Sequence, residues 1–226
     1  MNAKEGGSPR RRRPRAVERA DIQVEPHAAG LLERLIVLSD GVFAIAMTLL
    51  VVELTLPQAT SGATADLVAQ LRALGPRYLS YAVSFLVVAS YWTSHQRIYR
   101  YIVRADSTLV WLNIALLLCI AFQPFPTSVL GAFSTTPAVT FYAATLFGTG
   151  VVVLVLWVYA THDRRLVSPD LDRRLIQHHT LRAATAPLVF LVSIGIAQVN
   201  PSAAELSWLA IAVLIGGLRW LYRETT

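Results

Sequence analysis

Six long stretches of mainly apolar residues alternate with shorter polar segments along the chain. They occupy about residues 34–56, 76–99, 107–133, 137–161, 181–199 and 203–222. Roughly 20 apolar residues are enough for a helix to cross the hydrocarbon core of a membrane, because each residue adds about 1.5 Å. The pattern therefore predicts an all-α integral membrane protein with six transmembrane helices, and residues 30–226 form its membrane domain.

Polar and proline residues modify this pattern at several points. Pro124 and Pro126 are expected to break the third helix near its far end, which neighbouring helices can tolerate. The fourth stretch is the most uniformly apolar and is expected to face lipid or to be purely structural. Residues 162–180 are strongly charged and predict a linker outside the membrane. Only residues 200–202 separate the last two stretches, so these should form a tight helical hairpin.

Composition supports the membrane assignment. Hydrophobic residues make up 54% of the 226 residues and charged residues only 15%, with a mean hydropathy of +0.50. The net charge of +6 could suggest nucleic acid, but the basic residues cluster between apolar runs and form no continuous basic face, so no nucleic-acid partner is expected. The single cysteine, Cys119, excludes a disulfide framework and a thiolate metal site.

The basic residues also predict the orientation. If six helices cross the membrane, 18 of the 20 Lys and Arg residues lie in segments on one side of it, and only Arg72 and Arg77 lie on the other side. Basic loops stay on the cytoplasmic side, so both termini should be cytoplasmic and the protein should lie in the cell membrane. Residues 1–29, with the basic run Pro9–Arg15, are expected to be a disordered cytoplasmic tail that contacts anionic lipid head groups.

An acid inside the first apolar stretch is the most informative candidate. Asp40 would cost several kcal/mol in a membrane unless it is paired or hydrated. At 100° per residue it lies about 140° around the helix from Ile45. It should therefore point into its own bundle, away from an aliphatic stripe made of Gly41, Ile45, Thr48, Leu49, Val52 and Leu56.

Asp40 then needs hydrogen-bond donors at a similar depth. His95 is the best candidate, and Trp92, Asn113 and Arg97 are also within plausible reach. A simple ion pair that joins two helix ends would account for the acid equally well. The sequence contains no Walker loop, no zinc-protease motif and no carbonyl-type potassium filter, so it predicts no enzyme, no bound metal and no cofactor.

These residues resemble the transmembrane protein 175 family of potassium channels. Its first helix opens with Arg-x-x-x-Phe-Ser-Asp, and this chain has Arg34, then Leu38 in place of Phe, then Ser39 and Asp40. The runs YWTSHQRIY at 91–99 and LNIALLLCIAFQPFPTSVLGAF at 112–133 are also similar. The resemblance covers about residues 31–133, and the Leu38 departure concerns only the packing of that ring.

The resemblance implies a homotetramer in which the first helix of each subunit lines one central potassium pore. Rings of Ile45, Leu49 and Val52 would act as filter and gate, with the Thr48 hydroxyl nearby. A narrow apolar ring can gate by dewetting. Potassium releases its water more readily than sodium, so dehydration would favour it. The resemblance also implies a hydrogen-bonded network that supports the pore helix from behind, made of Arg34, Ser39, Asp40 and His95. Proton permeation in some family members is a further implication.

Two other functions remain open. The first is a proton-coupled secondary transporter in which Asp40 and His95 form a proton relay, although no inverted repeat is evident. The second is a membrane scaffold without transport activity, whose basic tail and charged linker recruit partners.

Overall fold

The regular elements of the computed structural model are helices. It describes residues 26–54, 68–69, 71–72, 74–133, 135–211, 214 and 217. Within these ranges the main elements, in chain order, are α1 (Pro26–Leu49) with the 3-10 turn η1 (Leu50–Glu53), α3 (Gly75–Tyr99), α4 (Ser107–Phe122), α5 (Pro124–Phe133), α6 (Thr136–Thr161), the 3-10 turn η2 (His162–Arg164), α7 (Arg173–Ala197) and α8 (Pro201–Ser207). The predicted N-terminal tail up to residue 25 and most of the predicted sixth helix lie outside the described residues.

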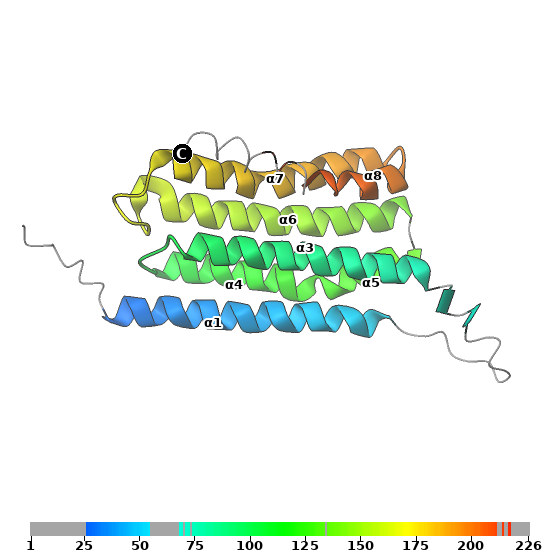
Figure 1. Ribbon diagram of the computed structural model, residues 1–226, viewed down its shortest axis with the longest axis horizontal. Helices are drawn as coiled ribbons and strands as arrows, with labels where there is room; N and C mark the ends of the chain where they lie inside the picture. Colours follow the sequence, from blue (N-terminus) through cyan, green and yellow to red (C-terminus); the bar gives the residue numbers. More distant parts are fainter. Residues whose placement is uncertain are drawn as a thin grey trace, which may run out of the picture.

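The helices form an elongated bundle of layers (Figure 1). Helix α1 lies along one edge and packs against α3 and α4. Helix α6 lies between α3 and the layer of α7 and α8, and it contacts α4, α5 and α7. Helices α7 and α8 form the opposite edge, where they pack against each other. The first helix therefore has one side in the bundle and one side on its surface.

Within the described residues, four helical segments are long and apolar enough to cross a membrane: Gly30–Val52, Ser107–Phe133, Thr136–Arg164 and Arg173–Ala197. Helix α3 has 25 residues, which is sufficient length, but its sequence is more polar. These findings agree with an all-helical membrane protein. The count of six transmembrane helices stays a prediction.

Local chemistry explains where several helices end. The helix break expected at Pro124 and Pro126 is present, because α4 ends at Phe122 and α5 begins at Pro124. Between them the N–H of Gln123 donates to the Ile120 carbonyl at 3.1 Å, which tightens the last turn of α4. The short connection at residues 200–202 does form a hairpin, because the Asn200 side chain accepts from the Ala203 N–H at 3.1 Å and caps α8.

One expected boundary differs from the structure. Helix α7 begins at Arg173, about two turns before the predicted start, because the Asp172 carboxylate caps it by accepting from the Arg174 N–H at 3.0 Å. Part of the charged linker is thus helical. Helix α6 packs between other helices, in line with the structural one of its two expected roles: Leu146, Leu156 and Trp157 are almost completely buried, while Val155 and Val158 are 46% and 44% exposed. Its apolar side chains meet protein on several sides.

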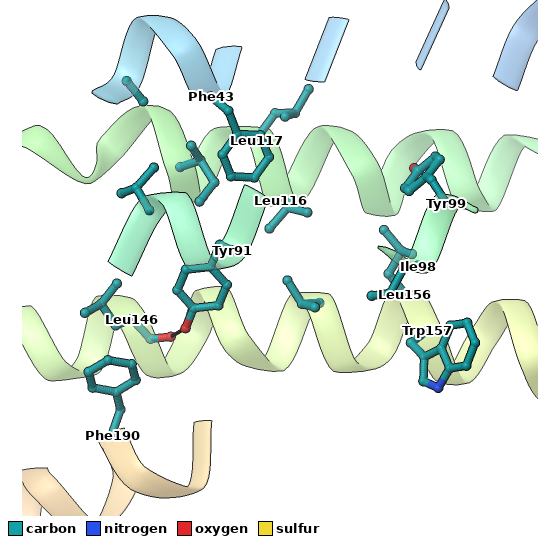
Figure 2. Packing of buried hydrophobic residues seen from close by; sticks show 14 of the residues in the cluster. Phe43, Tyr91, Ile98, Tyr99, Leu116, Leu117, Leu146, Leu156, Trp157 and Phe190 are labelled. Atoms are coloured by element: carbon teal, nitrogen blue, oxygen red, sulfur yellow. Dashed lines mark hydrogen bonds between the residues drawn. The ribbon is translucent and has the colours of Figure 1, made fainter. Parts of the chain in front are cut away.

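Figure 2 shows this core. Phe43 from α1 packs above Leu116 and Leu117 of α4, and the Tyr91 hydroxyl of α3 reaches across to donate to the Leu146 carbonyl at 2.8 Å. The bond satisfies a buried hydroxyl that would otherwise be costly in an apolar core. It fixes α3 against α6 behind the first helix.

Helices α6 and α7 approach each other closely at Gly150. A Cβ atom built on Gly150 would lie 2.8 Å from Cδ and 3.1 Å from Cβ of Pro187, inside van der Waals contact. The proline ring is rigid and buried, so it cannot move aside cheaply. Gly150 is therefore required by the packing of these two helices.

We expect Gly150→Ala to destabilise the protein by about 1–3 kcal/mol, the usual cost of overpacking a core. Gly148 is the matched control, because a Cβ there meets nothing within 4 Å. Gly148→Ala should be neutral or slightly stabilising, since Ala favours helix over Gly. Thermal unfolding of the purified protein in detergent checks both variants. Equal melting temperatures for the two would contradict the proposed close contact.

Candidate pore helix and its supporting network

Helix α1 has two chemically distinct faces. One face of α1 and of the η1 turn that continues it is buried against α3 and α4, and its side chains recur every three or four residues as Leu35, Ser39, Phe43, Ala46 and Leu50. The other face is exposed in the single chain and is mostly aliphatic. The exposed fractions are 60% for Ile45, 46% for Leu49 and 62% for Val52. Thr48 is exposed as well. The outward face thus carries all four residues predicted to line a pore, namely Ile45, Thr48, Leu49 and Val52.

The Thr48 hydroxyl is engaged within its own helix. It donates to the Ile45 carbonyl at 2.9 Å. This bond is the common arrangement for a threonine in a membrane helix. The oxygen of the hydroxyl nevertheless remains on the exposed face, where its lone pairs could contact a cation.

A hydrogen-bonded bridge holds the buried face of α1 to two other helices. The Asn113 amide of α4 donates from Nδ2 to the Ser39 hydroxyl at 3.0 Å, and its Oδ1 lies 3.0 Å from His95 Nε2 of α3. Because an amide oxygen only accepts, His95 Nε2 must carry the proton. The exposed fractions of all three side chains are at most 1%. This bridge joins α1, α3 and α4 at one level of the bundle.

His95 is enclosed by rings. Its imidazole stacks on Tyr99 at a centroid distance of 4.1 Å and lies 5.8 Å from the Phe43 ring. The Nδ1 atom of His95 and the hydroxyl of Tyr99 are buried and have no hydrogen-bond partner among the described residues. Asn113 therefore fixes the imidazole through one nitrogen and leaves the other free to accept.

Asp40 has different partners from the one that the sequence favours. Its carboxylate accepts from Trp92 Nε1 at 2.8 Å and from the Gln96 amide. His95, which the sequence favours as the donor to Asp40, is bonded to Asn113 instead. Trp92 is among the predicted alternatives, whereas Gln96 is not. The spacing of four residues between Trp92 and Gln96, which places both on one side of α3, is the signal that could have identified the pair.

Arg34, the remaining residue of the predicted support network, is not brought into it. Its side chain is exposed, and the structure gives it no partner among the described residues. Asn113 joins Ser39 to His95, whereas Asp40 is held separately by Trp92 and Gln96 of α3. Among the residues that the structure describes, no three His, Cys, Asp or Glu side chains cluster closely enough to hold a metal ion.

Comparison with known proteins identifies the family. The model of the family "Endosomal/lysosomal potassium channel TMEM175" matches residues 34–124. A relative from Chamaesiphon minutus, described as a potassium channel, is 33% identical over 179 residues, which are 77% of this chain and 85% of the relative. The chain belongs to the TMEM175 family. A relative from Streptomyces collinus, also described as a potassium channel, is 32% identical over 72% of this chain and 80% of its own length.

A solved structure agrees with this assignment. The crystal structure of a lysosomal potassium-selective channel TMEM175 homologue from Chamaesiphon minutus matches with a TM-score of 0.73 and 29% identity, over 83% of this chain and 97% of that one. The TMEM175 family match begins at Arg34 and includes every member of the polar network from Ser39 to Asn113. The protein is accordingly a multi-pass membrane protein of a channel family.

The Asp40 contacts can be tested with a matched pair of tryptophan variants. Trp92→Phe removes the indole N–H that binds Asp40, and should lower the free energy of unfolding by about 1–2 kcal/mol, near the low end for a bond to a charged acceptor. Trp111→Phe is the control, because Trp111 is 70% exposed on α4. Thermal unfolding in detergent should show a loss for the first variant only. An unchanged melting temperature in both would show that the Asp40 bond contributes nothing to stability.

Proposed function

We propose that this chain is the pore-forming subunit of a passive potassium channel, in which α1 lines the ion pathway. The observation that carries the proposal is the division of α1 into a buried, hydrogen-bonded face and an outward aliphatic face. Membership in the TMEM175 family supports it, as do the two relatives described as potassium channels. Residues 30–226 would form the channel domain, with six helices in the membrane.

Assembly would complete the pathway. One helix cannot enclose a pore, but copies related by rotational symmetry can. Helix α1 lies at the edge of the bundle, so its outward face is accessible to copies of itself (Figure 1). We assign a homotetramer with α1 at the centre, both termini on the cytoplasmic side, and residues 1–29 as a basic tail near the anionic leaflet.

The outward face of α1 would act as filter and gate. Four copies each of Ile45, Leu49 and Val52 would form successive aliphatic rings, which a hydrated ion passes only by losing water or displacing side chains. Such rings favour potassium over sodium, because potassium is less strongly hydrated. The Thr48 oxygen, between the Ile45 and Leu49 rings, would offset part of the dehydration cost.

The polar network would set the rotation of α1 about its axis. Ser39 and Asp40 are bound to α4 and α3, so the buried face cannot turn outward without leaving polar groups unsatisfied. The aliphatic rings are thereby kept toward the centre. In this proposal Asp40 supports the pore helix and is not an ion-binding residue.

Replacing Ile45 by Asn should raise potassium conductance severalfold and reduce selectivity over sodium, because an amide lets the narrowest ring hold water. Conductance and reversal potential in a planar bilayer under mixed potassium and sodium measure both effects. Leu191→Asn is the control: Leu191 is 50% exposed on α7, at the opposite edge of the bundle. Absence of electrogenic potassium flux in liposomes, or flux that Ile45→Asn leaves unchanged, would exclude the proposal.

A proton-coupled transporter is the second candidate, because His95 Nδ1 is buried and free to accept a proton. It requires Asp40 to change its protonation state during each cycle. Asp40→Asn keeps an oxygen that can accept from Trp92 but cannot titrate near neutral pH. A channel should retain passive potassium flux in this variant. Saturable, pH-driven uptake that disappears in Asp40→Asn would instead establish the transporter.

A further inference from the structure

Arg34 lies on the same line along α1 as the aliphatic residues of the outward face. It precedes Ile45 by 11 residues, which at 100° per residue is three full turns plus about 20° and a distance of about 16 Å along the helix. Leu38 lies one turn beyond Arg34, within about 40° of it, and is 51% exposed. The outward face of the apolar segment Gly30–Val52 therefore begins with a cationic side chain and continues with aliphatic ones.

The charge of Arg34 is not neutralised by its own helix. The side chain is exposed, and among the described residues no carboxylate lies within ion-pair distance of it. Asp40 accepts from Trp92 and Gln96 on the buried side of α1. Glu33 is exposed but lies about 100° around the helix from Arg34. Neither acid of this half of α1 shares the line that Arg34 follows.

The helices packed against α1 provide no counter-charge either. Helices α3 and α4 contain no Asp or Glu residue. Asp106, which immediately precedes α4, accepts from the Leu109 N–H at 2.8 Å and from the Tyr159 hydroxyl at 2.6 Å. Its carboxylate is thus engaged in capping α4 and in holding α6. In an assembly with α1 at the centre, four copies of Arg34 would concentrate positive charge at one mouth of the pathway.

We propose that Arg34 forms a cationic ring at the mouth of the ion pathway, which limits potassium entry and makes the conductance depend on ionic strength. The inference rests on the channel proposed above and adds a residue that regulates its rate. A ring of like charges lowers the local concentration of potassium, and dissolved salt screens this effect. The aliphatic rings respond to the hydration of the ion, whereas the Arg34 ring responds to its charge.

Single-channel conductance of the assembled protein in planar bilayers, with the same potassium chloride solution on both sides, tests the ring. Arg34→Gln should raise conductance about threefold at roughly 0.01 M salt, where charges act over about 30 Å. It should have no effect at roughly 1 M salt, where they act over about 3 Å. A gain that persists unchanged at the higher concentration would indicate an altered pore shape and would overturn the proposal.

Two further variants separate charge from structure. Arg34→Lys keeps the charge and should match the wild type at both salt concentrations. Glu33→Gln is the matched control, because Glu33 is equally exposed and adjacent in sequence but off the line. It should leave conductance unchanged. A loss of conductance in Glu33→Gln as large as the gain in Arg34→Gln would show that acids of neighbouring copies neutralise Arg34, and would overturn the cationic ring.

The ring and the channel can fail separately. Arg34 is exposed, so Arg34→Gln should unfold at the same temperature as the wild type in detergent. If the wild type carries potassium and responds to Ile45→Asn, but Arg34→Gln gives no salt-dependent gain, the ring is wrong and the channel stands. If the wild type carries no potassium, both proposals fail.

Discussion

The two-sided hydrogen bonding of the Asn113 amide is the interaction on which the arrangement of α1 depends. Its nitrogen donates to Ser39 and its oxygen accepts from His95, each at 3.0 Å, in a site that is almost completely buried. Rotation of α1 by one residue, about 100°, would remove Ser39 from the Asn113 amide and leave the Asn113 N–H without this acceptor in an apolar environment, at about 1–3 kcal/mol. The bridge thereby selects which face of α1 is turned outward, and Asp40, bound to Trp92 and Gln96, reinforces the same setting.

The other half of the bundle is held mainly by close packing. Helices α6 and α7 meet where Gly150 admits the Pro187 ring, and α6 is buried by neighbours on several sides. Near the start of α7 the indole of Trp157 donates to the Thr180 hydroxyl at 3.0 Å. Packing of this kind leaves little freedom to α6 and α7. Helix α1, in contrast, packs against α3 and α4 on one side and leaves its aliphatic face exposed.

Periodicity and proline chemistry predicted much of this arrangement. The 100° rule separated Asp40 from the aliphatic stripe, and Pro124 and Pro126 located the helix break. Depth along a helix could not distinguish among several donors for Asp40, so the sequence favoured His95 over Trp92 and did not identify Gln96. The apolarity of α6 could not separate burial from lipid contact, because both require the same residues. The polar start of α7 has the composition of a loop, and its cap at Asp172 and its packing on Trp157 make it helical.

Exposed apolar side chains remain at both edges of the bundle. The α1 face is a stripe on a single helix, and one helix cannot enclose a pathway, whereas copies related by symmetry can. The α7 face includes Leu188, Leu191 and Val192 on a segment long and apolar enough to cross the membrane, where lipid alone can cover it. Exposure of apolar residues is therefore not enough to locate a pore, and the polar network behind α1 is the feature that distinguishes its face from that of α7.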